Sequence, residues 1–474
     1  MVLNVENILA SRYASKEMTD IWSPHARVIS ERKLWVAVLK AQKDFGFEVE
    51  DQVISDYESV IDSVDFDSIR ERERVTRHDV KARLEEFSYL AGHEHVHKGM
   101  TSRDLTENVE QLQIRQSLEL TINLIVASLS RLGRLAVENS SLVIAGRTHN
   151  VAAQPTTLGK RFANAAEELL HAYYRTDFLL KNYPLRGLKG PVGTQQDLLD
   201  LFGGDSEKVS SIENRLAEIL GFENVLDSVG QVYPRSLDFE VLSTLVQISS
   251  APANLAKTIR LMAGHDLVSE GFQDGQVGSS AMPHKTNART SERIGGLSIV
   301  LKGYLAMVSN LIGDQWNEGD VSCSVVRRVA LPDSFLAIDG LFQSFLTVLD
   351  DFGSFPEVIE KELVEQLPFL LTTRILIAAV QEGLGRETAH EIIGDHAIKA
   401  VNAKRVGDEA IIFTDLLASD DRIPLDQEMI RGLLDDRSNL VGNTSKQIQS
   451  IIEKIADVIA LRPLGSSYKP EPIL

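Results

Sequence analysis

Residues 271–292, GFQDGQVGSSAMPHKTNARTSE, combine the side chains that acid–base chemistry on an anion requires. Glycines in the first half give a backbone that can open and close. The paired serines Ser279 and Ser280 bring hydroxyls. Lys285 brings a positive charge, and Asn287 both donates and accepts hydrogen bonds. Such a segment suits a lid that closes over an anionic substrate and stabilises developing negative charge, although a surface Gly/Ser loop before a helix has the same composition.

Three further segments place a histidine beside hydroxyl and charged residues: TRHDV, HVHKGMTSRD and GRTHNVAAQPTT. Their central histidines are His78, His97 and His149. An imidazole, with an unperturbed pKa of about 6.5, transfers protons in both directions near neutrality. We therefore expect general acids or bases in these segments. The isolated histidines, by contrast, are expected to be structural: His25, His171, His265, His390 and His396.

A metal site is the alternative interpretation of His93, His95 and His97. In an extended segment these alternating residues would face one side, as metal ligands do. A helix would scatter them instead, and neither a nearby cysteine nor a Glu-x-x-His pattern supports a metal. The sequence therefore predicts neither a metal nor a cofactor.

The overall composition narrows the class of protein. The chain has 474 residues, 43% hydrophobic and 25% charged, with a net charge of −19. So acidic a chain is a poor candidate for broad binding of nucleic acid or of anionic membranes, whereas a local basic cluster would still hold an anionic small molecule. The single cysteine, Cys323, excludes an intramolecular disulfide and a cysteine-based zinc site, which fits a reducing, cytoplasmic environment.

Targeting segments are not evident. The N-terminus carries Glu6, Arg12, Lys16 and Glu17 without a sustained apolar core, unlike a signal peptide. We also expect no apolar run of the roughly 20 residues that a membrane span needs, and hence no membrane partner.

Long helical periods dominate the chain. Leu118, Ile122, Ile125, Leu129 and Leu132 follow a 4-3-4-3 spacing that predicts one apolar stripe on a helix over 107–138. Further helices are expected at 156–182, 236–268, 288–316 and 332–351. No convincing alternation indicates strands, so the sequence predicts an all-α fold with unusually long helices.

The helical segments suggest three domains. We expect an N-terminal helical domain at 1–110 and a central long-helix bundle domain at 111–360 that contains 271–292. A turn at DFGSFPE precedes a C-terminal helical domain at 361–474.

The stretch SSAMPHKTN resembles the signature loop of the fumarase/aspartase superfamily. Its Ala before Met and His before Lys, together with TRHDV and GRTHNVAAQPTT, resemble the adenylosuccinate lyase branch more than fumarase or argininosuccinate lyase. Two departures are visible: Ala288 stands where the family usually has Pro, and Gly319 stands where many members have Arg. Arg327, or an arginine of another subunit, is a candidate to replace the phosphate contact of that Arg.

The resemblance implies three helical domains, with the central helices of four subunits in one bundle and active sites shared between subunits. It also implies β-elimination of fumarate from adenylosuccinate, giving AMP, and from the succinyl-carboxamide ribotide SAICAR, giving AICAR, in purine nucleotide biosynthesis. The partners it implies are a small nucleotide substrate and copies of the same chain.

The resemblance assigns catalytic roles residue by residue. Ser280 is the general base, and His149 is the acid that protonates the leaving nitrogen. His97 holds the substrate and tunes charge, Lys285 supplies positive charge, and Glu292 orients a histidine.

Other motif positions, including those in SRYASKEM, GQVYPRSLD and QWNEGDVSCSVVRRVALPD, correspond to substrate contacts. They are Arg12, Tyr13, Arg77, His78, Asp79, Thr101, Ser102, Thr148, Gln231, Ser279, Met282, Asn287, Ser324 and Arg328. Arg186 and Lys189, in the basic turn RGLKGPVGTQQ, are more readily interpreted as solvated charges than as ligand contacts.

Two alternatives stay open at this point. The chain is another superfamily lyase, such as argininosuccinate lyase, fumarase or a carboxymuconate cycloisomerase, or it is a non-catalytic helical scaffold of the same fold. The joint presence of Ser280, Lys285, His149 and His97 favours an enzyme, because a scaffold need not retain all four.

Overall fold

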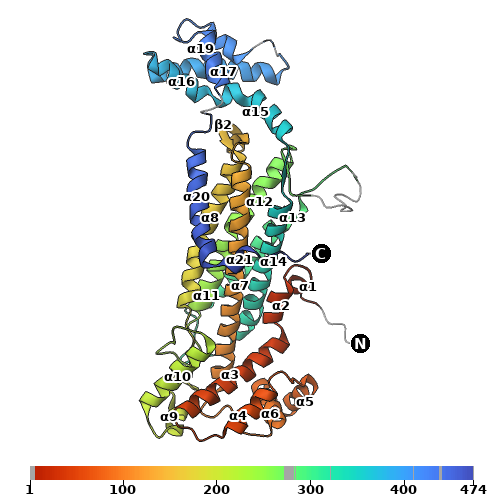
Figure 1. Cartoon of the computed structure of the whole chain (residues 1–474), viewed down its shortest axis with the longest axis vertical. Helices are drawn as coiled ribbons and strands as arrows, with labels where there is room; N and C mark the ends of the chain where they lie inside the picture. The colour runs from red at the N-terminus through yellow and green to blue at the C-terminus, as the bar shows by residue number, and fades with distance from the viewer. Residues whose placement is uncertain are drawn as a thin grey trace.

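Helix α7 (Ser102–Glu138) is the axis of the molecule in the computed structural model, which describes residues 6–271, 282, 284–320, 322–408, 410, 412–436 and 440–472. Its 37 residues span about 55 Å at 1.5 Å per residue. Buried side chains lie all round its middle turns, because other helices surround it. The helix predicted over 107–138 is confirmed, and it begins five residues earlier (Figure 1).

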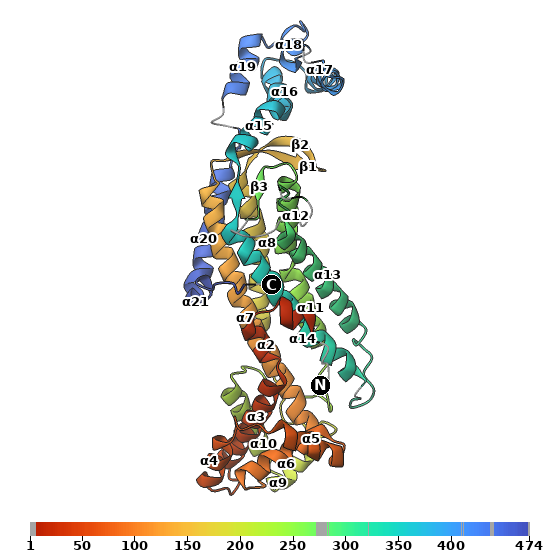
Figure 2. The same ribbon diagram turned by 90° about the vertical axis from the view of Figure 1, so that its right-hand side faces the viewer.

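Long helices pack along α7 and share one apolar core with it (Figure 2). They are α8 (Leu158–Asn182), α11 (Ser236–Ile248), α12 (Ser250–Ala263), α13 (Arg289–Ser309), α14 (Cys323–Asp351) and α20 (Thr444–Leu461). The segment predicted as one helix over 236–268 is two helices that meet at Ser249. The segment predicted at 288–316 ends earlier, at Ser309.

Shorter helices gather at the end of the molecule where α7 begins, apart from α1 and α2, which lie beside the bundle (Figures 1 and 2). These helices are α1 (Ile8–Arg12), α2 (Lys16–Ile21), α3 (Pro24–Asp44), α4 (Asp51–Ser59), α5 (Phe66–Thr76), α6 (Asp79–Ala91), α9 (Gln196–Leu201) and α10 (Ser206–Leu220).

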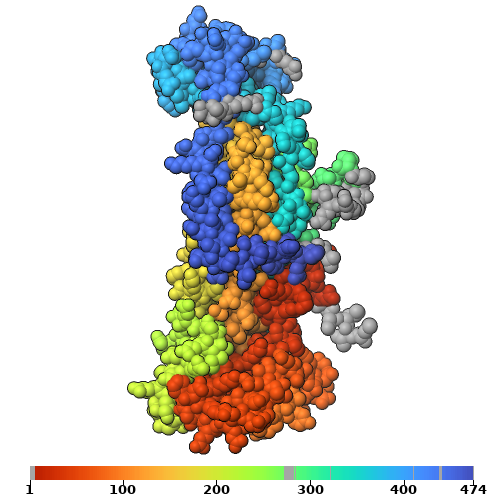
Figure 3. Space-filling view, in the orientation of Figure 1, coloured from red at the N-terminus to blue at the C-terminus, as the bar shows by residue number. Residues whose placement is uncertain are grey.

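The opposite end carries a helical group with an apolar core of its own. Its helices are α15 (Pro356–Leu370), α16 (Thr372–Gln381), α17 (Arg386–Arg405), α18 (Phe413–Ala418) and α19 (Gln427–Asp435). After α20 and α21 (Pro463–Ser466), the C-terminal segment crosses the bundle towards α1 and α2 (Figure 3). The Lys16 amide there donates to Glu471 Oε2 at 2.9 Å. The proposed limits at residues 110 and 360 stay predictions.

A β-hairpin joins α7 to α8, and the sequence analysis missed it. Strands β1 (Val143–Thr148) and β2 (Val151–Thr157) pair antiparallel, and a short pair, β3 (Val268–Ser269) and β4 (Gly353–Ser354), lies near the same end. The two-residue turn is His149-Asn150, with φ of 51° and 64°. Positive φ at both positions is the pattern of a type I′ turn, which usually needs Asn-Gly or Gly-Gly. Because His149-Asn150 lacks the usual glycine, the sequence did not predict the turn. The bundle itself is all-α, as predicted.

Three described helical stretches are long and apolar enough to cross a membrane by length and composition alone: Ser102–Glu138, Cys323–Asp351 and Pro356–Gln381. The expectation that no apolar segment reaches this length is therefore wrong. The most apolar windows of the first two are 72% and 83% buried inside the chain, which accounts for their composition. The corresponding window of the third is 33% buried.

Gly340 in α14 permits the close approach of α1, which gives a test of the packing. A Cβ at residue 340 would lie 2.7 Å from Tyr13 Cβ and 2.8 Å from the Tyr13 carbonyl oxygen. Gly340→Ala should therefore push Tyr13 away and lower the free energy of unfolding by about 1–3 kcal/mol, as overpacking does. Chemical denaturation measures this change.

Gly394 in α17 is the matched control, because a Cβ there meets nothing within 4 Å. Gly394→Ala should leave stability unchanged or raise it by up to about 1 kcal/mol through helix propensity. Equal effects of the two substitutions would refute the close packing of Tyr13 on α14.

Candidate active site

The first group of predicted site residues lies where α7 begins. Thr101 is the N-cap of α7, and its amide donates to Asp104 Oδ2 at 2.8 Å. Ser102 follows as the first residue of the helix. The Arg103 guanidinium donates to Ser324 Oγ at 3.0 Å, which joins this end of α7 to the start of α14. The Ser324 hydroxyl thus lies at the guanidinium of the residue that directly follows Thr101 and Ser102 in the chain.

His97 lies beside this group in a conformation rare for a non-glycine residue, with φ of 69°. Its Nδ1 accepts a hydrogen bond from Trp35 Nε1 at 3.0 Å. An indole N–H only donates, so this bond places the proton of the neutral imidazole on Nε2. Burial lowers the pKa of His97, and Asp104 opposes the shift without cancelling it. His97 is therefore a neutral imidazole at pH 7.

His78 and Asp79 lie at the junction of α5 and α6. Arg77 ends α5 with φ of 52°, and the His78 ring caps α6 by accepting from the Lys81 amide at 3.3 Å. Burial by itself would raise the pKa of Asp79, but the Arg83 guanidinium 3.2 Å away outweighs it and leaves that pKa lowered. An ionised carboxylate and an exposed imidazole are thus available here.

The three histidines of the metal hypothesis have different hydrogen-bond partners, although the ring centroids of His93 and His95 lie 6.4 Å apart. His93 Nε2 lies 2.7 Å from Asp56, His95 lies 3.3 Å from the Lys98 ammonium, and His97 contacts Trp35. Within the ranges that the structure describes, no group of three or more His, Cys, Asp or Glu side chains is arranged to hold a metal ion.

Gln231 and Ser324 belong to the first group. The neighbouring Arg327 and Arg328 differ from each other in burial. The Gln231 amide donates to the Glu318 carbonyl at 2.6 Å. Arg328 is exposed, whereas Arg327 is buried. The Arg327 guanidinium contacts the carboxylates of three residues, Glu107, Glu110 and Asp238. The suggestion that Arg327 replaces a phosphate contact is therefore wrong, because its donors are already used inside the protein.

The packing around residue 319 favours glycine at that position. Its φ is 149°, and a Cβ there would lie 3.2 Å from Gln231 Cβ and 3.3 Å from a Val232 methyl group. A side chain at this position would therefore disturb Gln231, which accounts for glycine where many relatives have arginine.

Arg186 and Lys189 are also buried, against expectation. Arg186 pairs with Asp104 at 2.5 Å, and Lys189 pairs with Glu213 at 2.9 Å. Burial of an ion is tolerated when it is paired and hydrogen-bonded, and both cations meet that condition. Arg186 holds the turn after α8 against α7, Lys189 holds it against α10, and neither side chain is solvated.

The second group lies beside the start of α13. The Tyr13 ring faces the Arg293 guanidinium, 5.7 Å from its carbon to the ring centroid, and Arg12 is exposed next to it. Burial lowers the pKa of Arg293, and Arg289 and Arg12 lower it further through repulsion. The clustered positive charge is suited to an anion such as a phosphate.

Lys285 is exposed and Asn287 is half-buried in the segment that leads into α13. Glu292 pairs with Arg260 of α12 at 3.3 Å, so no histidine of the same chain is oriented by it. Met282 is exposed. Ser279 and Ser280 lie outside the described residues, and the predicted base is therefore untested by geometry.

The first amides of α13 are already occupied. Glu270 accepts from the amides of Thr290 and Ser291, at 2.8 Å each. Ala288 is the N-cap residue and offers no side-chain cap, so Glu270 supplies the missing acceptor. These two amides are therefore engaged inside the chain.

The third group lies in the hairpin. Thr148 and His149 are exposed at its turn, beyond the C-terminal end of α7. His97 lies just before the N-terminal end of the same helix, so about 55 Å of helix separates the two histidines. Gly340 of α14 packs against Tyr13 of the second group. It lies 16 residues along α14 from Ser324 of the first group, which is about 24 Å. One chain therefore holds the predicted residues as three separate groups.

Comparisons with known proteins identify the family. A family model described as "Lyase" matches residues 14–303, and one described as "Adenylosuccinate lyase C-terminus" matches residues 368–451. Adenylosuccinate lyase of Schistosoma mansoni is 32% identical, over 98% of this chain and 96% of its own length. That of Saccharomyces cerevisiae is 33% identical, over 99% and 98%. The chain belongs to the adenylosuccinate lyase family.

Solved structures support the fold of this family member. Fumarate lyase from Mesorhizobium sp. BNC1 aligns with a TM-score of 0.80 at 20% identity, covering 93% of this chain and 98% of that one. The 3-carboxy-cis,cis-muconate lactonizing enzyme from Pseudomonas putida aligns with a TM-score of 0.81 at 18% identity, covering 96% and 100%. At such identities the likeness concerns the fold alone.

Sequence reasoning missed three residues that organise these groups: Arg103, Trp35 and Arg293. Arg103 directly follows the Thr-Ser pair of its motif, which was an available signal. Trp35 and Arg293 lie far in sequence from His97 and Tyr13, and only the folded chain brings them together.

The hydrogen bond from Trp35 gives a pH prediction. Trp35→Phe removes the donor that favours the neutral imidazole, so the pKa of His97 should rise towards its ordinary value of about 6.5. NMR titration of labelled histidine between about pH 5 and 8 measures it. In the unsubstituted chain the folded pKa lies below the unfolded one, so His97 lowers stability as pH falls below about 6.5.

Trp22→Phe is the control, because Trp22 donates to Ser117 Oγ and not to a histidine. It should leave the His97 titration unchanged. An unaltered His97 pKa in Trp35→Phe would contradict the assigned hydrogen bond.

Proposed function

We propose that this chain cleaves adenylosuccinate into AMP and fumarate, and SAICAR into AICAR and fumarate. The observation that carries the proposal is the near full-length similarity to adenylosuccinate lyases, at 32% and 33% identity. The segments TRHDV, GRTHNVAAQPTT and SSAMPHK of the sequence agree with it.

The reaction poses two chemical problems. Removal of a proton from the carbon next to a carboxylate produces a carbanion, whose charge spreads onto that carboxylate and must be stabilised. The leaving nitrogen must also gain a proton as the C–N bond breaks. The site therefore needs one base, one acid and several cationic or hydrogen-bonding groups, and no cofactor.

Ser280 is the proposed base and His149 the proposed acid. A serine hydroxyl becomes basic only in a cationic, water-excluded surrounding, which Lys285 helps to provide. His149 suits the acid role because it projects, exposed, from the turn of a hairpin. Glu292, whose partner within the chain is Arg260, would orient a histidine of a neighbouring copy.

The remaining site residues divide between the two halves of the substrate. Thr101, Ser102 and Asn287 bind the succinyl carboxylates. His97, neutral and protonated on Nε2, donates one hydrogen bond to the substrate, and His78 lies beside the nucleotide. The other proposed contacts are Arg12, Tyr13, Arg77, Asp79, Thr148, Gln231, Ser279, Met282, Ser324 and Arg328.

Assembly of copies is part of the proposal, because one chain keeps these groups tens of ångströms apart. We expect a homotetramer in which each site takes residues from several chains. The exposed face of α13 supports a helix–helix contact between copies: Ile299 is 69% exposed, and a Cβ at Gly295, Gly296 or Gly303 would meet nothing within 4 Å. The acidic composition and the single cysteine fit a cytoplasmic enzyme.

A fumarate-release assay tests the function. The purified chain should release fumarate and AMP from adenylosuccinate, and fumarate and AICAR from SAICAR, while argininosuccinate and 3-carboxymuconate should give no product. Turnover of one of the latter two, without turnover of adenylosuccinate, would assign the chain to another activity of the superfamily.

His149→Gln tests the acid. With adenylosuccinate, kcat should fall by about 10²–10⁴-fold, since general acid catalysis contributes that much. A substrate analogue with a better leaving group should lose less. His171→Gln is the matched control, because His171 is exposed on α8 away from the proposed site and should retain full activity. Equal losses for good and poor leaving groups would contradict the acid role.

A further inference from the structure

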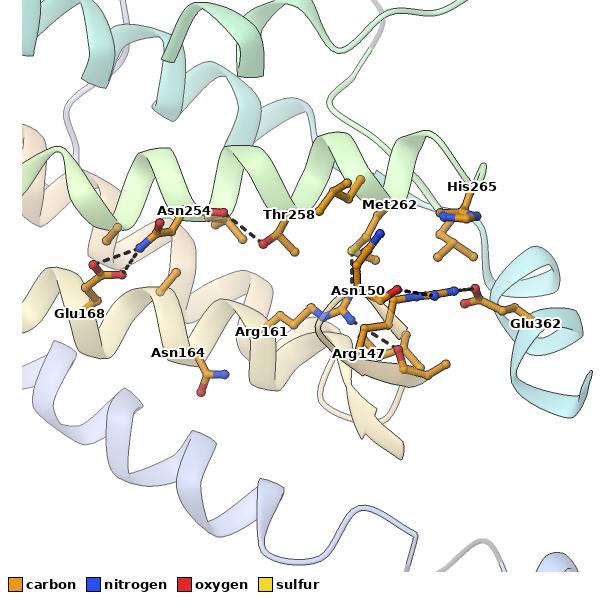
Figure 4. Close-up of a pocket in the computed structure, with 17 residues that line it drawn as sticks. Arg147, Asn150, Arg161, Asn164, Glu168, Asn254, Thr258, Met262, His265 and Glu362 are labelled. Atoms are coloured by element: carbon orange, nitrogen blue, oxygen red, sulfur yellow. Dashed lines mark hydrogen bonds and ion pairs between the residues drawn. The ribbon is translucent and has the colours of Figure 1, made fainter. Parts of the chain in front are cut away.

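A cavity of about 370 Å³ lies behind the hairpin, between α8, α12 and the start of α15 (Figure 4). Of the residues proposed above for substrate or catalysis, none that the structure describes lines it. Arg147 and Asn150 do line it, and these two flank Thr148 and His149 in the hairpin. Successive side chains of a strand point to opposite faces, so Arg147 enters the cavity and Thr148 points away.

Arg161 of α8 brings a positive charge into the cavity, and among the residues that the structure describes no carboxylate pairs with it. Its guanidinium donates to Met262 Sδ at 2.8 Å and to the Ala145 carbonyl at 3.4 Å. A thioether is a weak acceptor, and neither group is charged. Burial lowers the pKa of Arg161, and Arg147 lowers it further, with Glu362 opposing the shift. An anion bound beside Arg161 would stabilise the charged guanidinium against both its burial and the repulsion from Arg147.

The wall of the cavity already holds one carboxylate on a guanidinium. Glu362 of α15 forms an ion pair with Arg147, which also donates to the Asn150 carbonyl at 3.3 Å (Figure 4). Two guanidiniums therefore share a single nearby carboxylate. This end of the cavity carries a net positive charge and a geometry that accepts carboxylates.

The rest of the cavity is largely apolar. Leu255, Leu261 and Leu267 line it, together with Ile144. The carboxylate of Glu168, at the far end, already accepts hydrogen bonds within the chain. Asn254 Nδ2 donates to its two oxygens at 3.2 and 3.1 Å, and Ser250 Oγ donates to one of them at 2.5 Å. The negative charge there is thus satisfied by uncharged donors, and it lies apart from Arg161 along α8 (Figure 4).

We propose that this cavity binds a small carboxylate that carries an apolar body. The carboxylate lies on Arg161 and shares Arg147 with Glu362, while the body packs against the leucines between α8 and α12. A volume of about 370 Å³ falls in the range typical of sites for small organic ligands. The class of ligand follows from an apolar wall beside a guanidinium whose described acceptors are both uncharged.

Occupancy would act on the hairpin. The turn residues His149 and Asn150 both have positive φ, a conformation that the surrounding contacts must maintain. A ligand that ties Arg147 to Arg161 would fix β1 against α8 and hold the turn in place. We therefore assign a regulatory role to the cavity, in which the bound ligand holds the turn that carries His149 in place, and this role rests on the proposed function of His149.

Benzoate is the probe, and benzamide is its neutral isostere. Ligand-detected NMR titration of the full-length chain should show saturable binding of benzoate and at least tenfold weaker binding of benzamide. Arg161→Gln should weaken benzoate binding at least tenfold. Glu362→Gln should strengthen it severalfold, because the competing carboxylate is gone. Arg175→Gln, which changes an exposed arginine of the same helix, should leave the affinity unchanged.

These opposite responses show that benzoate binds in the cavity. If benzoate bound at the proposed substrate site instead, neither Arg161→Gln nor Glu362→Gln would change its affinity. The measurement needs no turnover, so its outcome is separate from that of the fumarate assay. Equal affinity of benzoate for Arg161→Gln and the unsubstituted chain would overturn the proposal, as would equal binding of benzamide. If Arg161→Gln does not fold, an unchanged affinity in Glu362→Gln overturns it.

Discussion

The length of α7 constrains everything else in this protein. A single uninterrupted helix of 37 residues has His97 and Thr101 before one end and the His149 turn beyond the other. No bend of a loop can bring such groups together, because the surrounding helices bury α7 and hold it along its length. In the proposed reaction, the acid His149 and the substrate-holding His97 would therefore come from different copies of the chain.

Buried charge fixes the end of α7 where Thr101 and Ser102, the proposed substrate contacts, lie. Asp104 caps the first turn and pairs with Arg186, and one turn further on Glu107 accepts from Arg235 and Arg327. Removing one partner of such a network leaves an uncompensated charge inside the protein, which costs about 3–5 kcal/mol. The network occupies Arg327, which the sequence offered as a candidate phosphate contact, and it anchors the first turn of α7, where Thr101 and Ser102 lie.

The helices could be predicted because their apolar spacing repeats every three and four residues, and α7 is the clearest case. The hairpin could not, because its turn uses His149 and Asn150 where the pattern expects glycine. The motifs identified the candidate residues, but partners distant in sequence decide their state: Trp35 sets the tautomer of His97, and Glu270 occupies the amides that open α13. Such contacts leave no periodic signal.

Subunit complementation measures the shared site most directly. His149→Gln and His97→Gln should each be nearly inactive alone. After the two are mixed and subunit exchange is verified with distinguishable tags, about a quarter of the sites should combine an intact His149 from one chain with an intact His97 from another, if the assembly is a symmetric oligomer with shared sites. Activity should recover to a corresponding fraction of that of the unsubstituted enzyme. Verified exchange without recovery, or full activity of an isolated monomer, would contradict the account.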